Sequence, residues 1–135
     1  MANEKTFKAQ VLTPEGSRFD GDVVSVRVPG ATGSFQMMHN HAPIISALDV
    51  GRVDIQKADN STLSYAVSGG FVEMNDNQVT LLAERAVEPA DINVEEAKKK
   101  LSDAKDKLKN TSTVMLSDVE HQIKDAQNLI KMANE

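Results

Sequence analysis

A chain of 135 residues with a net charge of −5 and no cysteine predicts one or two small domains, without disulfides or thiolate metal sites. The negative charge, with no basic stripe backed by aromatic residues, argues against nucleic acid as a partner. The first residues contain no apolar segment of the secretory type, and no apolar run is long enough to span a bilayer. We therefore expect any membrane association to depend on a partner protein.

Residues 5 to about 86 are predicted to form short β-strands, because apolar and polar residues alternate there. The alternating segments are Phe7–Val11, Val24–Val28, Val53–Ile55 and Leu63–Val67. A turn at Ala58–Ser61 predicts a hairpin, and a second turn at Asn75–Asn77 joins Phe71–Met74 to the strand after it. Between them, Gly69-Gly70 is expected to break the strand. Turns this frequent are typical of a sandwich or barrel.

The apolar period changes after Pro89 to steps of three and four residues, which indicates helices. The first stripe is Val94, Ala97, Leu101, Ala104 and Leu108; the second is Leu116, Val119, Ile123, Ala126, Ile130 and Ala133. Asn93 is predicted to cap the first helix, and Ser117 with Glu120 to form a capping box on the second. Asn110–Thr113 separates them, as in an αα-hairpin.

The predicted fold class is therefore α+β in two modules: an antiparallel β-sandwich over residues 1–87 and an antiparallel two-helix hairpin over residues 88–135. Neither module carries an evident catalytic motif. A compact β module joined to a hairpin is typical of a protein that docks and switches.

The sharpest enzyme hypothesis is metal binding by His39 and His41, whose spacing from Gly33 copies the start of the cupin motif. That motif next needs a Glu where this chain has Ile45 or Ser46, and the remaining histidine, His121, lies in the second helical stripe. Because two ligands without a carboxylate make a poor metal centre, we expect no metal site. A cupin-like metal-dependent enzyme is the alternative function, and a free-standing protein-binding module is a third.

The first helix is locally basic, with two acidic residues among its lysines. The lysines are Lys98, Lys99, Lys100, Lys105, Lys107 and Lys109. They form either a solvated face or a surface that engages an acidic partner. Sequence physics does not choose between these two interpretations.

One distinctive stretch runs from Gly30 to Phe35 and continues with His41-Ala42-Pro43, and a second is Ser68–Glu73 followed by Val79-Thr80 and Leu82–Glu84. Together these stretches resemble the epsilon subunit of F-type ATP synthases. The resemblance covers nearly the whole chain, including the change to helices near residue 88. It implies a non-catalytic subunit of the central stalk, peripheral on the cytoplasmic face of the energy-transducing membrane, which couples proton flow to ATP synthesis.

In that family the sandwich binds the gamma subunit and the membrane c-ring. The resemblance implies c-ring contacts at one end of the sandwich, from Ala31, Thr32, Gly33, Ser34, His41 and Ala42. The hairpin folds against the sandwich or extends along gamma toward the catalytic alpha and beta subunits, where it restrains ATP hydrolysis. The lysines of the first helix would then meet an acidic segment of beta.

Some bacterial members bind ATP on the hairpin through an Ile-Asp-x-x-Arg-Ala segment. The matching segment here is Ile92–Ala97, in which Asn93 replaces the Asp and Glu96 replaces the Arg, and no arginine follows Arg85. Replacing a cation that faces phosphate by an anion reverses the local electrostatics. We therefore expect no cofactor.

Overall fold

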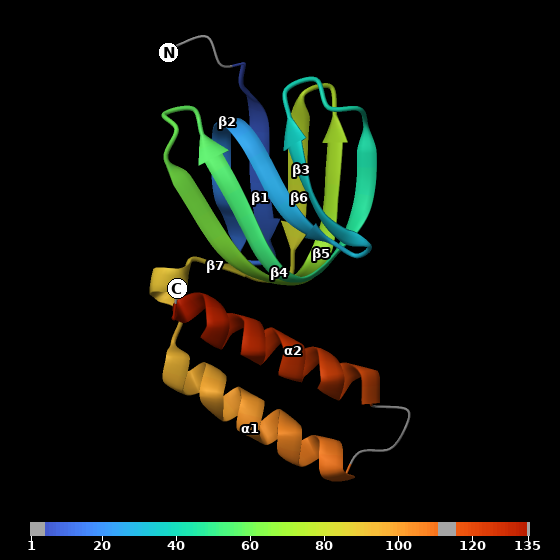
Figure 1. Cartoon of the computed structure of the whole chain (residues 1–135), viewed down its shortest axis with the longest axis vertical. Helices are drawn as coiled ribbons and strands as arrows, with labels where there is room; N and C mark the ends of the chain where they lie inside the picture. The colour runs from blue at the N-terminus through green and yellow to red at the C-terminus, as the bar shows by residue number, and fades with distance from the viewer. Residues whose placement is uncertain (1–4, 111–115, 135) are drawn as a thin grey trace.

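A computed structural model describes residues 5–110 and 116–134. The strands form one closed module, and the helices lie side by side beneath one end of it (Figure 1). The strands are β1 (Phe7–Thr13), β2 (Gly16–Gly30), β3 (Gly33–Met38), β4 (Ile44–Lys57), β5 (Thr62–Asn75), β6 (Gln78–Ala83) and β7 (Ala86–Val87). A 3-10 turn, η1 (Pro89–Asp91), leads to α1 (Val94–Asn110) and α2 (Leu116–Ala133). The predicted sandwich followed by a helical hairpin is confirmed.

The strand order β1-β6-β5-β4-β2-β3 closes on itself, because β1 also pairs with β2. β1 and β6 run parallel, and the other pairings of the described strands are antiparallel. Closure matters because it leaves few unpaired strand edges for unwanted association.

Both predicted hairpins are present. β4 and β5 pair from Gln56 opposite Thr62 back to Ile44 opposite Met74. At the second turn, Asp76 and Asn77 have φ values of 50° and 57°. Two consecutive positive φ values are the geometry of a type I′ turn, which matches the twist of the strands that it joins.

Gly69-Gly70 does not break the strand, contrary to the sequence prediction. β5 continues through both glycines and keeps one register with β4 on either side of them. Instead, the two glycines, with φ values of 115° and 140°, reverse which side chains face inward. Tyr65 and Val67 are buried before the bend, and Val72 and Met74 after it. β4 changes face at the same level, near Gly51, so each long strand crosses both layers.

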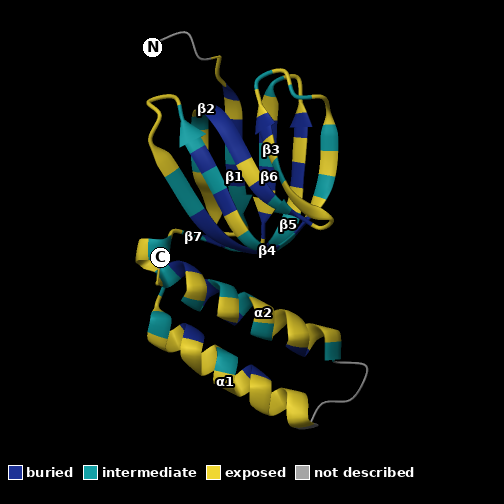
Figure 2. Ribbon diagram, viewed as in Figure 1, coloured by how far each residue is buried: buried dark blue, intermediate teal, exposed yellow. Residues whose placement is uncertain are grey.

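The core is one continuous apolar cluster inside the sandwich, drawn from all strands that close the module (Figure 2). It is built largely from valine, with Ile55, Leu81, Met37 and Met74 as its largest fully buried members. Tyr65 is the buried aromatic residue whose hydroxyl donates to the carbonyl oxygen of Arg18 at 3.0 Å. Burial raises the pKa of Tyr65, so this hydroxyl stays protonated.

The hairpin packs through small residues: Ala97 and Ala104 of α1 and Val119 and Ala126 of α2 are buried. The predicted cap on α1 is confirmed, since Asn93 Oδ1 accepts from the backbone N–H of Glu96 at 3.0 Å.

The predicted capping box on the second helix is wrong. Ser117 lies inside α2, which already includes Leu116, so Ser117 cannot be the residue that precedes the helix. The predicted interruption lies, beyond Asn110, outside the described residues.

Candidate docking surfaces

The predicted c-ring contacts lie at opposite ends of β3, not at one end of the sandwich. Ala31 and Thr32 form the turn between β2 and β3, and Gly33 and Ser34 begin β3. His41 and Ala42 follow the other end of that strand. The strand residues Phe35–Met38, which span about 13 Å, and the turn at His39 and Asn40 separate the two sets. The sequence could not show this, because an extended segment and a folded-back loop look alike in a local pattern.

The turn at residues 31–34 is the more exposed of the two sets. All four of its residues are exposed, and the Ala31 N–H donates to the carbonyl oxygen of Ala47 at 2.9 Å, which anchors the turn. Gly33 has a φ of 138°, a conformation that favours glycine. The turn is therefore a fixed projection beside the hairpin end of the sandwich (Figure 1).

The loop at His41 is held at the far end. The backbone N–H of Asn40 donates to Asn77 Oδ1 at 2.7 Å, and Asn77 Nδ2 donates to Asn40 Oδ1 at 3.0 Å. The His41 Nδ1 lies 2.6 Å from the carbonyl oxygen of Ala42. Both histidines are half-buried, and no group of three His, Asp or Glu residues comes together within residues 5–110 and 116–134.

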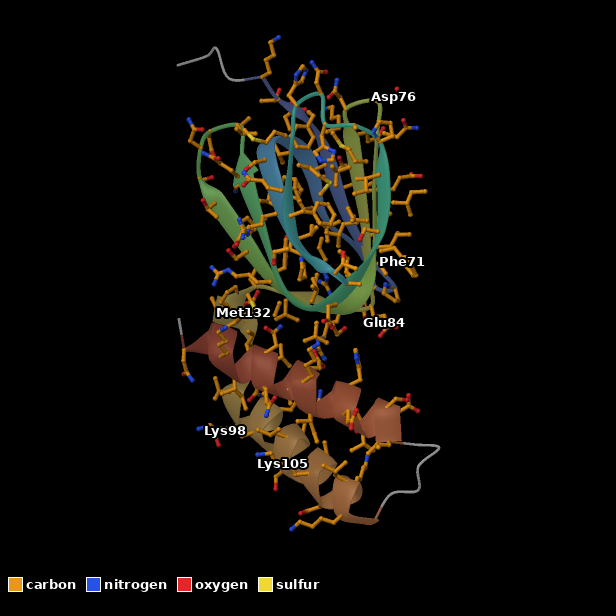
Figure 3. All side chains as sticks on the ribbon, turned by 45° about the vertical axis from the view of Figure 1, so that its right-hand side comes forward. Phe71, Asp76, Glu84, Lys98, Lys105 and Met132 are labelled. Atoms are coloured by element: carbon orange, nitrogen blue, oxygen red, sulfur yellow. The ribbon has the colours of Figure 1, made fainter. Side chains whose placement is uncertain are left out.

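The lysines of α1 do not share one face. Lys98, Lys105 and Lys109 fall on one flank of the helix, and Lys100 and Lys107 on the other, because a helix turns by about 100° per residue. Lys99 points between the flanks, away from the buried Ala97. Lys98 and Lys105 mark α1 as the outer helix of the hairpin in Figure 3. Lys100 of the same helix pairs with Glu96 at 3.4 Å.

The junction between hairpin and sandwich is made chiefly by α2, which lies between the sandwich and α1. Leu129 and Met132 of α2 are buried with Ala66 of β5 and Ala97 of α1. The predicted apolar stripe omitted Leu129 and Met132. They form a second stripe beside Ala126 and Ile130. The wider apolar face that results could have indicated from the sequence that α2 packs against a second partner.

Three polar contacts also join α2 to the sandwich. Arg85 donates from one nitrogen to both carboxylate oxygens of Asp125, at 2.5 and 2.6 Å. Lys124 donates to Asp49 at 2.7 Å, and the Asn128 amide donates to the Gly51 carbonyl oxygen at 3.0 Å. The hydrogen bond from Lys124 lowers the pKa of Asp49. The bends of β4 and β5 thus form the seat on which α2 rests.

The segment compared above with an ATP-binding motif lies at this junction. A hollow beside Arg85 is lined by Asn93, Glu96, Ala97 and Lys100. The Asn93 side chain is engaged in capping α1, and Glu96 pairs with Lys100. Two anions, Asp91 and Glu96, thus line the hollow together with Arg85 and Lys100, both of which are engaged in ion pairs.

Comparison with known proteins identifies the family. The family model described as "ATP synthase, Delta/Epsilon chain, beta-sandwich domain" matches residues 6–89. The chain belongs to the ATP synthase delta/epsilon chain family. It is 41% identical over 83 residues to the ATP synthase epsilon chain of Chlorobium limicola, covering 62% of this chain and 94% of that one. It is 43% identical over 93 residues to the epsilon chain of Halalkalibacterium halodurans, covering 69% of each.

Two solved structures have the same fold. A chain in the Euglena gracilis mitochondrial ATP synthase matches with a TM-score of 0.82 at 18% identity, over 96% of this chain and 82% of that one. A chain in the Tetrahymena thermophila central stalk and c-ring structure matches with a TM-score of 0.72 at 13% identity, over 96% of this chain and 98% of that one.

The family membership confirms a subunit of an ATP synthase, not an enzyme in its own right, and the cupin-like alternative finds no support. Neither described helix combines the length and apolar character needed to cross a bilayer.

Proposed function

We propose that this chain is the epsilon-type subunit of the central stalk, which couples proton flow to ATP synthesis in a rotary ATP synthase. The family match over residues 6–89 carries the proposal, and the likeness of the whole fold to chains of two synthases supports it. Its partners are the gamma subunit and the c-ring, and it lies peripherally on the cytoplasmic face of the energy-transducing membrane.

Affinity purification of the tagged full chain from membranes of its source organism tests this proposal. We expect the alpha, beta and gamma subunits to co-purify in fixed stoichiometry. Recovery of the chain with unrelated proteins, and without these subunits, would indicate a free-standing binding module instead.

We assign the c-ring contact to the turn at Ala31, Thr32, Gly33 and Ser34. One face of a ring meets one end of the sandwich, and this turn is the exposed and fixed projection. A rigid turn loses little conformational entropy on binding. Cysteine at Thr32 or Ser34 is expected to cross-link to the polar loop of subunit c, whereas cross-linking from Ala42 alone would give the contact to the His41-Ala42 end.

We assign regulation to residues 88–135 and attachment to residues 1–87. In the extended state, Lys98, Lys99, Lys100, Lys105, Lys107 and Lys109 reach the acidic segment of beta and restrain ATP hydrolysis. Since these lysines surround α1, only part of the set meets one flat partner, and exposed pairs contribute about 0–1 kcal/mol each.

Hydrolysis by the assembled enzyme separates charge from apolar contact. We compare the wild-type chain, a chain with these lysines replaced by Ala, and a chain truncated after Val87. Electrostatic restraint predicts that the lysine variant and the truncation both release activity, and that salt weakens the restraint. Release by truncation alone would assign the restraint to the apolar stripe, and equal activities would contradict a regulatory hairpin.

A further inference from the structure

A second hollow lies where α2 meets β2, β3 and β4. It has a volume of about 380 Å³, and residues of the three strands and of the last turns of α2 line it. Its buried lining residues are Val50 of β4 and Met132 of α2, and Figure 3 shows Met132 where the helix meets the sandwich. It shares no lining residue with the hollow beside Arg85. It is therefore a separate site between the two modules.

Irregular strand pairing explains why this hollow exists. Residues 27–30 of β2 lie opposite residues 48–54 of β4, so three steps along one strand correspond to six along the other. The extra residues of β4 form a bulge, which bends a strand out of its regular ladder. Within the bulge, the Gly51 carbonyl oxygen accepts a hydrogen bond from the Asn128 side chain of α2 at 3.0 Å. The bulge thus brings β4 against α2 at the hollow.

Cationic side chains from three elements line this hollow. They are Arg27 of β2, Arg52 of β4 and Lys131 of α2, and Asp54 is the one carboxylate in the described lining. Three cations and one anion leave a net charge of +2 here, in a chain whose net charge is −5. Cations gathered against the overall sign of the chain raise the local concentration of anions.

The carboxylate of Asp54 is already engaged. Arg52 Nε donates to Asp54 Oδ1 at 2.9 Å, and Arg52 Nη2 donates to Ser64 Oγ at 3.3 Å. Ser64 Oγ in turn donates to Asp54 Oδ1 at 2.6 Å. This network holds Arg52 in one position, and it offsets the charge of Asp54 within β4 and β5. Asp54 therefore does not neutralise the two remaining cations.

Those two cations come from different modules. Within residues 5–110 and 116–134, neither Arg27 nor Lys131 forms an ion pair. Lys131 follows Asn128 by three residues, so both side chains lie on the same side of α2. Because Asn128 is bonded to Gly51, this turn of the helix is fixed against the bulge. The docked hairpin thus brings a lysine and an arginine to one hollow with no anion paired to either.

We propose that this hollow binds a small phosphate dianion, either inorganic phosphate or a phosphomonoester, through Arg27, Arg52 and Lys131. A phosphoryl group carries close to two negative charges near neutral pH, which matches the charge of the hollow. Guanidinium groups pair with phosphate oxygens in a geometry that they share with few other anions. The inference goes beyond the proposed function and does not depend on it.

The site requires both modules, which gives the ligand a regulatory effect. Lys131 belongs to the hairpin, whereas Arg27 and Arg52 belong to the sandwich. A ligand that contacts all three binds the docked state more tightly than the released state, and by linkage it stabilises docking. The concentration of a phosphate compound thus sets the fraction of docked hairpin.

Calorimetry on the purified full chain tests binding. Inorganic phosphate and glycerol 3-phosphate are titrated separately at constant ionic strength and slightly alkaline pH, with acetate as the monoanion for comparison. We expect saturable binding of at least one phosphate and none of acetate. The tighter of the two phosphates shows whether the ligand is phosphate itself or its monoester.

A pair of substitutions tests the assigned residues. Arg27→Gln with Lys131→Gln is expected to weaken binding at least about tenfold, because two charge-assisted contacts are lost. Arg18→Gln with Lys105→Gln is the matched control, since it also removes an arginine of β2 and a lysine of the hairpin, but neither lines the hollow. Its affinity should stay within about twofold. If thermal unfolding shows that the first pair does not fold, Lys131→Gln alone is compared with Lys105→Gln.

Hydrogen exchange of the α2 amides tests whether the hairpin completes the site. Phosphate at about ten times its dissociation constant should slow this exchange about tenfold, because the ligand favours the docked state. Sodium chloride at equal ionic strength should not slow it, and the Arg27/Lys131 variant should not respond to phosphate.

Four results would overturn the inference. They are the absence of saturable heat with both phosphates, equal binding by the two variant pairs, equal slowing by chloride, and binding that leaves α2 exchange unchanged. The last would place the anion on the sandwich alone. None of these measurements involves assembly with a synthase, so the proposed function stands or fails separately.

Discussion

The sandwich and its junction with the hairpin are stabilised by different contacts. Among the described residues, the sandwich core contains eighteen buried apolar residues in one cluster, whereas the cluster at the junction contains four, two of them alanine. Burying a large apolar side chain stabilises by about 1.5–3 kcal/mol, so Leu129 and Met132 contribute a small fraction of what the core contributes. The junction also contains two ion pairs, Arg85–Asp125 and Lys124–Asp49. Both pairs require α2 to lie in this one position on the sandwich, and they are lost when it moves away. The difference supports the proposal that residues 1–87 stay attached while residues 88–135 can be released.

The largest expected effect breaks the sandwich itself. Gly70→Ala places a Cβ 2.0 Å from the Leu82 carbonyl oxygen, in a backbone conformation of φ 140°. We expect a loss above about 4 kcal/mol, since backbone strain and a clash with backbone add together. The control is Gly33→Ala, which has the same strain at φ 138° but meets no atom within 4 Å. Its loss should be about 1–2 kcal/mol. Equal losses by denaturant unfolding would show that the clash is relieved by movement of β6.

A second prediction compares the two regions with similar substitutions. Ile55→Ala in the fully buried core should cost about 2–5 kcal/mol of unfolding free energy, because it removes transfer energy and leaves a cavity. Leu129→Ala should leave the main unfolding transition within about 0.5 kcal/mol and act instead on the docking of α2. Hydrogen exchange of α2 amides measures docking, since an isolated helix of this length is marginal. A shared loss in the main transition would mean that the two modules unfold as one.

A smaller effect is expected from the polar contact between modules. Asp125→Asn leaves Arg85, whose Nε is already buried without a partner, facing a neutral group. Docking of α2 should weaken by about 1–3 kcal/mol, reported as faster exchange in α2 with an unchanged sandwich transition. Glu120→Gln, an exposed site on the same helix, is the matched charge control. Equal exchange rates of the α2 amides in both variants would show that the Arg85–Asp125 contact does not stabilise the docking of α2.

The smallest effect is a pH dependence of docking. The hydrogen bond from Lys124 lowers the pKa of Asp49 below its ordinary value of 3.8. The pair therefore contributes fully above that value and is lost as the pH falls through the lowered pKa in the docked state. Because both side chains are about half exposed, the contribution is about 0–1 kcal/mol. Exchange in α2 should quicken, after correction for intrinsic rates, as the pH falls below about 4. Asp49→Asn should reduce this dependence, and an unchanged profile would assign it to another carboxylate.

Local patterns were sufficient for most elements of the fold. The turn at Asn75–Asn77 and the cap at Asn93 were both predicted, because their geometry is set by neighbours within a few residues. The effect of the two glycines in β5 was predicted wrongly. A glycine pair can either end a strand or bend it, and only the pairing of β5 with β4 shows which of the two occurs.

The candidate surfaces depended on long-range contacts, which the sequence pattern does not contain. Forty residues separate Arg85 from Asp125, and neither stands out in its own segment. Phe71 and Leu82 lie opposite each other on β5 and β6, yet each alone is an ordinary exposed side chain. The opposite positions of Thr32 and His41 likewise follow from β3 being extended.

The parallel pairing of β1 with β6 has a consequence for the order of events during synthesis. Phe7–Thr13 leaves the ribosome before the other described strands and can pair at once with Gly16–Val23, but its other edge waits for Gln78–Ala83. Loop closure over that distance is entropically costly and slow compared with forming a hairpin. The first strand made is therefore the last to be enclosed, and until then the buried faces of Phe7, Ala9 and Val11 are open to other chains. A nascent chain stalled before Gln78 should be the species most prone to aggregation and most in need of a chaperone.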